Sequence, residues 1–401
     1  MTNSFGSRSL AASALLASVR DVVDERPVGA APPTWSVRRG WAPFLASLSD
    51  DEVLAAEREG LAARLSTLDG APGDLVRLGR DIAAITALRS VAPAVADVAG
   101  RRASPRKRAQ VAAFAGLIQS LARGASRVVD VGAGHGHLTR HLAEALGVET
   151  EGWERDAARV AVATSLASSS SARFLALDVV ASAAELRRTD VVVGLHACGA
   201  LGDHAVRVAS DVGAAVALIG CCLQKREGAR EPLAPPVDVD RNALVLGRDV
   251  LGLGNARDGE AGVEEDLVTR GAARARRVAL RLLLADAGLD VGAGAEMRGV
   301  NRRRASGPLL GLASLAFRAR GLDAPSPSQV ADAERRAAVL HAAERRQSLA
   351  RTMLARLIEV WVALDRAALL ASRGYDVDVV LAFDEATSPR NVAVLGRRVF
   401  D

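Results

Sequence analysis

The stretch VVDVGAGHGHLTRHLA, residues 128–143, decides the fold of this chain. It begins as a run of valines that contains the acid Asp130, turns through Gly132, Gly134 and Gly136, and continues with leucines at helical spacing. This pattern predicts a strand, a glycine turn and a helix, the first half of a nucleotide-binding βαβ unit. The glycines let the backbone approach a ligand, and the start of the helix offers free N–H groups.

The spacing of the glycines indicates which cofactor the turn would hold. It is Gly-x-Gly-x-Gly, which lacks the last gap of the dinucleotide fingerprint. With Asp130 just upstream, it is typical of the S-adenosylmethionine (SAM) loop of class I methyltransferases. SAM has no pyrophosphate, so we expect the loop to pack on its amino-acid and ribose parts. The alternative is a tight strand–helix turn without a ligand.

Further apolar runs continue the alternation of strands and helices. Strands are expected at residues 147–153, 173–179, 190–195 and 214–219, and a C-terminal hairpin at 376–383 and 391–395. Apolar strands separated by helices predict a parallel sheet covered on both faces. The predicted fold is therefore α/β, a Rossmann-like sheet of seven strands with a helical N-terminal region and a helical insertion.

Acids at the strand ends predict the contacts to the cofactor. Glu154 lies about 20 residues after the glycine loop, where a ribose-binding carboxylate belongs. Asp178, near the end of the next strand, is expected to accept a hydrogen bond from the adenine amine. Asp130 and Leu195 complete the predicted SAM site with the three glycines. For any single acid, a helix N-cap or a solvated turn is the alternative.

The chain is expected to consist of four segments. They are a helical region over residues 1–100, a SAM-binding core over 101–225, a mainly helical insertion over 226–345, and a helix and hairpin over 346–401 that complete the sheet. One long helix is predicted over residues 347–373, and Trp35 and Trp41 are expected to be core anchors. Arginine runs near residues 274–277 and 302–304 are either solvated faces or RNA contacts.

The composition of the chain indicates its cellular compartment and the kinds of partner it binds. The chain has 401 residues, 49% of them apolar, and a formal net charge of +5. Nearly all of its positive charges are arginines. We attribute that bias largely to GC-rich coding, so it supports nucleic-acid binding only weakly. Three cysteines make no disulfide framework, and neither a signal peptide nor an apolar stretch of spanning length is found. These features predict a cytoplasmic protein with no membrane partner.

Several short motifs carry a family resemblance. They are SPRK at 104–107, DVGAGHG at 130–136, LHACG at 195–199, GCC at 220–222, the acids and arginine Glu359, Asp365 and Arg366, and SPRN at 388–391. From about residue 100 onward the chain resembles the methyltransferase-like protein 25 family, also named for an rRNA adenine dimethylase domain. The resemblance implies a class I SAM-dependent methyltransferase. The chain departs from the family at Leu223-Gln224, where Tyr-His is usual, and at Ala109-Gln110, where His-Glu is usual.

Loops at the carboxyl ends of the strands are expected to face one crevice beside the cofactor. His196 is the predicted base, because imidazole titrates near neutral pH; a hydrogen bond that orders the loop is the alternative. Cys198 is the other predicted catalytic residue, as a nucleophile toward a pyrimidine, although the Asp-Ala-Pro pattern of such enzymes is absent. The Asn/Asp-Pro-Pro-Tyr signature of exocyclic-amine methylation is also missing, which argues against adenine N6 as the target.

The acceptor is predicted to contact Lys107, Cys221, Cys222, Arg390 and Asn391. Alternatively, the basic start at Lys107 is solvated or meets the SAM carboxylate, and the motif at 388–391 only shapes a turn.

No metal site is expected, although five of the six histidines lie in the core segment with the cysteines. No Cys-x-x-Cys pair exists, and His137 and His141 share a helix face beside the cofactor loop. Glu359, Asp365 and Arg366 are interpreted as a structural ion-pair network.

Two functional hypotheses follow from these residues. The first is a SAM-dependent methyltransferase that acts on RNA or on a translation-associated protein. The second is a catalytically degenerate SAM fold that serves as an RNA or protein interaction module.

Overall fold

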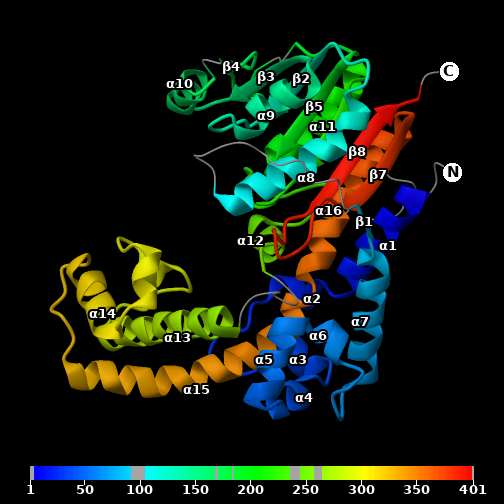
Figure 1. The fold of residues 1–401 in the computed structure, drawn as a ribbon. Helices are drawn as coiled ribbons and strands as arrows, with labels where there is room; N and C mark the ends of the chain where they lie inside the picture. Colours follow the sequence, from blue (N-terminus) through cyan, green and yellow to red (C-terminus); the bar gives the residue numbers. More distant parts are fainter. Residues whose placement is uncertain are drawn as a thin grey trace. The chain divides into compact units, whose positions relative to one another are not determined.

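The apolar runs of the sequence form one sheet in the computed structural model (Figure 1). Its strands are β1 (Arg89–Ser90), β2 (Arg127–Val131), β3 (Glu149–Glu154), β4 (Arg173–Ala176), β5 (Asp190–Leu195), β6 (Ala215–Ile219), β7 (Tyr375–Leu381) and β8 (Val392–Arg398). They lie in the order β1-β7-β8-β6-β5-β2-β3-β4. β8 is antiparallel to both of its neighbours, and the other pairs are parallel. This sheet confirms the predicted Rossmann-like α/β fold.

The sheet has one strand more than the seven that the sequence predicts. The additional strand, β1, is only two residues long and pairs in parallel with β7 at the edge of the sheet. Two exposed residues carry no periodicity, so the hydrophobic pattern could not reveal this strand.

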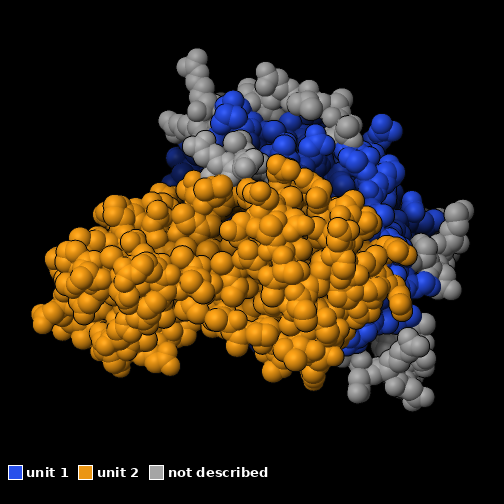
Figure 2. Space-filling view, turned by 90° about the horizontal axis from the view of Figure 1, so that it is seen from below, with its two compact units in different colours: residues 1–20, 81–257, 354–401 blue, residues 21–80, 258–353 orange. Residues whose placement is uncertain are grey.

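The structure describes residues 4–91, 104–167, 170–182, 185–234, 244–256 and 264–399. The chain divides into two compact units, which Figure 2 shows in different colours. Unit 1 contains residues 1–20, 81–257 and 354–401, and unit 2 contains residues 21–80 and 258–353. Segments 21–80 and 258–353 thus share a unit, an association that no motif in the sequence indicates.

Helices cover both faces of the sheet in unit 1. They are α1 (Ser4–Ser18), α8 (Pro105–Leu121), α9 (His137–Leu146), α10 (Ala157–Ser165), α11 (Ala200–Val212), α12 (Arg248–Leu253) and α16 (Ala355–Ser372). Phe114 of α8 and Leu142 of α9 share a core cluster with Val191 and Val193 of β5. α11 and α16 pack against β5, β6, β7 and β8. Because alternate residues of a strand point to opposite faces, the strand is covered by helices on both sides. All six residues of β5 are consequently buried.

A buried ion-pair network fastens the segment after β6 to the helices of unit 1. Asp203 of α11 pairs with Arg366 of α16 at 2.9 Å and with Arg230 at 3.0 Å, and Arg230 also pairs with Asp365 at 2.7 Å. Burial would raise the pKa of Asp203, but the charges of Arg366 and Arg230 hold it well below its usual range. The guanidinium of Arg230 lies over the ring of Trp361. The structural interpretation of Asp365 and Arg366 is thereby confirmed.

Glu359, the third member of the predicted ion-pair network, belongs to a separate group on the same helix. It pairs with Arg356 at 2.6 Å, and Arg356 also donates to the side-chain oxygen of Asn391 at 3.1 Å.

Unit 2 is helical. Its elements are α2 (Arg20–Asp24), α3 (Thr34–Arg38), α4 (Ala42–Ser47), α5 (Asp50–Glu59), α6 (Leu61–Arg64), α7 (Gly73–Thr86, whose last residues belong to unit 1), α13 (Glu264–Asp286), η1 (Ala295–Met297), η2 (Arg302–Ser306), α14 (Leu309–Arg318) and α15 (Pro327–Thr352). A cluster of small and branched side chains from α13, α14 and α15 forms one core. Trp35 and Trp41 are fully buried and meet edge to face, which confirms them as core anchors.

The single helix predicted over residues 347–373 is wrong, because the structure has two helices there. α15 ends at Thr352, and α16 begins at Ala355 after a turn at Met353 and Leu354. Both turn residues are fully buried apolar side chains, so the turn is invisible to a hydrophobic pattern. Among the helices of the described ranges, none combines the length and apolar character that a membrane span requires.

Replacing Arg230 by alanine should destabilise unit 1 by about 3–5 kcal/mol, because Asp365 would keep a buried charge without its cation. Urea unfolding followed by circular dichroism measures the loss. The matched control is Arg159→Ala, whose ion pair with Asp156 is about half exposed and should contribute under about 1 kcal/mol. Equal losses in the two variants would show that the buried network is not a stabilising element.

Candidate functional site

The glycine loop leaves β2 and enters α9 with a left-handed backbone. Gly134 has a φ of 59° and Gly136 a φ of 70°, a region that residues with a side chain rarely adopt. A Cβ at Gly136 would come within 2.3 Å of the Phe174 ring, whereas a Cβ at Gly134 would meet nothing within 4 Å. The middle of the loop therefore faces open space where a ligand can approach, while its end is closed by Phe174.

Asp130, in the strand before this loop, is hydrogen-bonded to the helix that follows the loop. It is 2% exposed, and the hydroxyl of Thr139 in α9 donates to its carboxylate at 2.7 Å. Burial raises the pKa of Asp130 to about 7, while the Thr139 hydrogen bond and the charge of Lys107 act in the opposite direction. Thr139 is a contact that the motif did not predict, although it lies in the first turn of the predicted helix.

The predicted ribose acid lies against the glycine loop. The two carboxylate oxygens of Glu154 accept from the backbone N–H of Gly134 at 3.0 Å and of Asp156 at 3.1 Å. Each oxygen keeps a second lone pair for a ligand hydroxyl. Asp178 follows β4 and accepts from the N–H of Val180 at 3.0 Å, as a turn-forming acid does. Leu195 is 7% exposed and its side chain belongs to the core cluster below the site.

Lys107 interacts electrostatically with groups at the cofactor loop and at the cysteine loops. It lies in the first turn of α8, and its charge interacts with Asp130 and with Cys221. Burial lowers the pKa of Lys107, and the two neighbouring groups counteract this shift. Lys107 is half-buried, so it is not a fully solvated helix start, and its contact with an acceptor stays a prediction.

His196 has a strained backbone at the end of β5. Its φ of 78° is the only positive value of a non-glycine residue among those the structure describes. The backbone N–H groups of His196 and Ala197 both donate to the carbonyl of Ile219, at 2.9 and 3.1 Å. These bonds hold the loop after β5 against the end of β6.

The His196 ring is half-buried, and its Nε2 lies 3.3 Å from the side-chain oxygen of Gln110 in α8. Burial lowers the pKa of His196 to about 4, and the charges of Lys107, Arg106 and Lys225 lower it further. The ring is therefore neutral at pH 7. If Nε2 donates to Gln110, Nδ1 is left as an acceptor, so both the base and the loop-ordering role remain consistent with the geometry.

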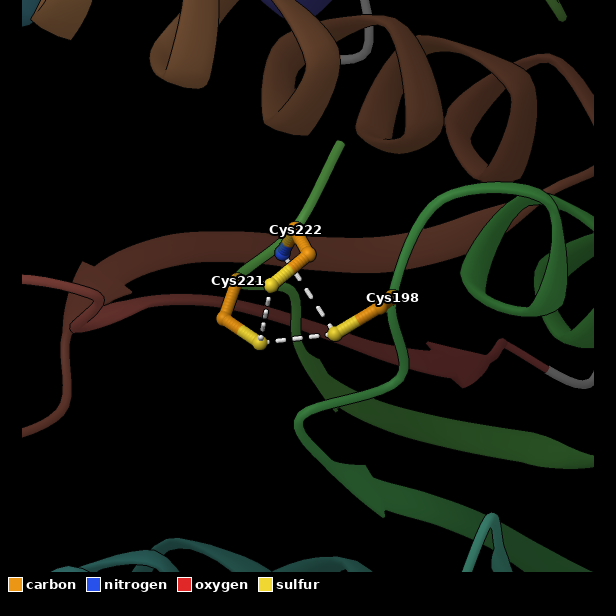
Figure 3. Close-up of side chains that lie close together, drawn as sticks. All are labelled: Cys198, Cys221 and Cys222. Atoms are coloured by element: carbon orange, nitrogen blue, oxygen red, sulfur yellow. Dashed lines mark hydrogen bonds between the residues drawn. The ribbon is translucent and has the colours of Figure 1, made fainter. Parts of the chain in front are cut away.

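Figure 3 shows the three cysteines gathered at the same edge of the sheet. The sulfur of Cys198 lies 2.7 Å from that of Cys221, which lies 3.6 Å from that of Cys222. The backbone N–H of Cys222 donates to the sulfur of Cys198 at 3.4 Å. Hydrogen bonding from Cys221 lowers the pKa of Cys198, and the neighbouring Cys198 raises that of Cys221. The sequence predicted that the two loops carrying these cysteines face each other, but not that the three sulfurs are in contact.

The two Ser-Pro-Arg motifs of the chain contact each other. Arg106, which was not among the predicted site residues, donates to the carbonyl of Thr387 at 2.9 Å and to the hydroxyl of Ser388 at 3.4 Å. Arg390 is half-buried and donates to the carbonyl of Asn255. Asn391 is 1% exposed and donates to the carbonyl of Phe383 at 2.8 Å. Its oxygen accepts from Arg356, so these contacts support the turn-shaping alternative for Asn391.

A cavity of about 490 Å³ lies elsewhere, among Arg123, Arg188, Asp190, Arg397 and Arg398. Asp190 begins β5 and Arg398 ends the antiparallel β8, so this cavity is at the opposite edge of the sheet from the glycine loop. It is not the candidate site.

His196 should make the protein less stable in mild acid. Its pKa of about 4 lies below the unfolded value of 6.5, so between these pH values the unfolded chain binds the extra proton and stability falls as pH falls. For this group alone the loss from pH 7 to pH 5 is about 2 kcal/mol. Urea unfolding of His196→Asn, which tolerates the positive φ, should show a smaller pH dependence than the parent. Parallel pH profiles would contradict the assignment.

Comparison with known proteins agrees with this geometry. A family model described as a methyltransferase domain matches residues 106–227. A comparison with curated proteins gives no significant match.

Three solved structures are similar to parts of this chain. The YcgJ protein from Bacillus subtilis has 22% identity and a TM-score of 0.24, and the match covers 27% of this chain and 50% of that one. The Pyrococcus abyssi tRNA (uracil-54, C5)-methyltransferase, in complex with S-adenosyl-L-homocysteine, has 16% identity and a TM-score of 0.23 over 28% and 29% of the two chains. SAM-bound CalS10, an amino pentose methyltransferase from Micromonospora echinaspora, has 23% identity and a TM-score of 0.26 over 33% and 59%. These matches span half or less of the first two proteins and say nothing about the acceptor.

The family match agrees with the arrangement of β2, the glycine loop and α9. The match covers the methyltransferase domain alone, so the finer resemblance to the methyltransferase-like protein 25 family stays a prediction. Residues 106–227 match a methyltransferase domain, and the strand, glycine loop and helix within them have the form of a site for the methyl donor S-adenosylmethionine.

Proposed function

We propose that this chain methylates RNA, with the acceptor seated over the loops that follow β5 and β6. One arrangement carries the proposal: Arg106 and Lys107 begin α8, whose Gln110 lies 3.3 Å from the His196 ring, and the Lys225 carbonyl accepts from Ala200, at the end of the loop that carries His196. The charges of these three cations act on the ring. Lys107 and Lys225 are the only two lysines of the chain. A group of cations at the edge of the cofactor loop favours an acceptor with phosphates.

The residues of the site divide into a cofactor side and an acceptor side. Glu154 and the glycine loop would hold the ribose, with Asp178 toward the adenine. The cofactor supplies a methyl group on a positively charged sulfur. His196 and the cysteine loops would position the acceptor in line with that methyl group. As the bond from the acceptor to the methyl carbon forms and the carbon–sulfur bond breaks, the acceptor loses its proton, which Nδ1 of neutral His196 is able to take.

The arginine runs of unit 2 do not carry this proposal. Arg277 pairs with Glu296 at 2.6 Å, and Arg276 donates to the carbonyl of Ala305 at 3.3 Å. Both side chains make contacts within unit 2, which neither of the two alternatives, a solvated face or an RNA contact, had predicted.

The test is labelled-methyl transfer from SAM into a cell lysate that lacks the endogenous gene, so that unmodified acceptor accumulates. Label that ribonuclease removes and protease does not would support RNA. Protease-sensitive label would overturn RNA in favour of a protein acceptor. SAM binding without transfer to either fraction would favour the interaction-module hypothesis.

Glu154→Ala should weaken SAM binding by about 1–3 kcal/mol, because a carboxylate that accepts from the ribose hydroxyls is lost. Isothermal titration calorimetry measures the effect. The control is Glu154→Gln, which keeps an oxygen for the N–H of Gly134 and should retain more affinity. Equal affinity in the alanine variant and the parent would refute the ribose assignment.

Lys107→Met should raise the KM for RNA about tenfold, since one phosphate contact is removed. It should also reduce the slope of log binding constant against log salt concentration by about one. Lys107→Arg keeps the charge and should lie close to the parent. Filter binding at several salt concentrations, with SAM affinity measured in parallel, checks this. A loss of SAM affinity with unchanged RNA binding would instead place Lys107 on the SAM carboxylate.

A further inference from the structure

We propose that Cys198, Cys221 and Cys222 form a binding site for Zn²⁺, with three thiolate ligands and a fourth position open to the crevice. The proposal goes beyond methyl transfer and does not rest on it. It differs from the sequence-based expectation of no metal, which depended on the absence of a Cys-x-x-Cys pair. The structure brings the cysteines together from two loops instead, although Cys198 and Cys221 are 23 positions apart in the sequence.

The three sulfur atoms are spaced for a single metal ion. All of them lie within 4.8 Å of one another; Cys221 is 2.7 Å from Cys198 and 3.6 Å from Cys222. Zinc–sulfur bonds of about 2.3 Å in a tetrahedron put sulfurs about 3.8 Å apart. Binding would therefore move the sulfurs of Cys198 and Cys221 apart by about 1 Å. In a [4Fe–4S] cluster each thiolate binds a different iron, so its sulfurs would be spread more widely.

The loops that carry the cysteines are held by bonds that do not involve sulfur. The carbonyl of Ile219 accepts from His196 and Ala197, and the carbonyl of Lys225 accepts from Ala200 at 3.1 Å. Gly199 makes a tight approach, since a Cβ there would lie 2.0 Å from the Lys225 carbonyl oxygen. Because the backbone is already positioned on both sides, little ordering is left for the metal to impose.

The ligand set favours zinc with an exchangeable fourth ligand. Thiolates select soft or borderline ions, and zinc accepts three protein ligands with water or substrate in the fourth position. Among the described residues, no further histidine, cysteine or carboxylate belongs to the group. Three thiolates and Zn²⁺ carry one net negative charge, and the nearby charges of Lys107 and Lys225 would balance it. A zinc-bound Cys198 would not act as the nucleophile that attacks a pyrimidine.

The experiment measures metal in the full chain, purified with a reductant and without chelators. Plasma mass spectrometry should find about one zinc per chain. After removal of zinc, added Co²⁺ should give thiolate-to-cobalt charge-transfer absorption and the visible bands of a tetrahedral ion. Cys198→Ser and Cys222→Ser should each lose most of the zinc, whereas the control His204→Ala, on α11, should keep it.

The cobalt spectrum of the parent tests the site even if a serine variant fails to fold. Two results would overturn the proposal. One is a parent protein that has three freely titrating thiols, no zinc, and no cobalt absorption. The other is a chain with a single titrating thiol and no metal, which would show that Cys198 and Cys221 form a disulfide instead.

Discussion

The Ile219 carbonyl, which accepts two backbone N–H groups at the end of β5, is the contact on which the site depends. It joins the ends of two neighbouring parallel strands and forces His196 into a left-handed conformation. Parallel strands end at one edge of a sheet, so the loops beyond them meet there. This junction brings His196 and Cys198 from one loop beside Cys221 and Cys222 from the next. Without it, the histidine and the thiols would have no fixed relation to the glycine loop.

A second constraint is the buried charge network around Asp203. Buried ion pairs add little net stability compared with apolar packing, but a missing partner is costly. Arg230 contacts acids on both α11 and α16, and Asp365 accepts from the backbone of Leu233 and Ala234. The network therefore selects one path for the chain directly after the cysteine loop. Charge specifies geometry here, and the hydrophobic cluster on the other face of the sheet supplies the burial.

Most of the fold could be predicted from the sequence because its strands are continuous apolar runs. The glycine turn and the position of Glu154 beside it follow from their places relative to a strand end, whereas a contact of Asp178 with adenine stays a prediction. The Ser-x-x-Glu spacing of Ser49 and Glu52 forms a capping box. What could not be predicted depends on contacts between distant segments. The close contacts among the three sulfurs, the contact of Arg106 with Ser388 and the turn at Met353 leave no local pattern, because the partners are set by tertiary packing.

The placement of β8 has a consequence for how the chain is made. β8 lies between β6 and β7 and supplies the ladder partner of each, yet it is the last strand in the sequence. During synthesis, one edge of β6 therefore has no strand to pair with until residues 392–398 emerge from the ribosome. A message that stops short of these residues would yield a chain with two unpaired strand edges, the kind of surface that promotes aggregation. The order of the strands thus makes residues 392–398 a requirement for closing the gap between β6 and β7.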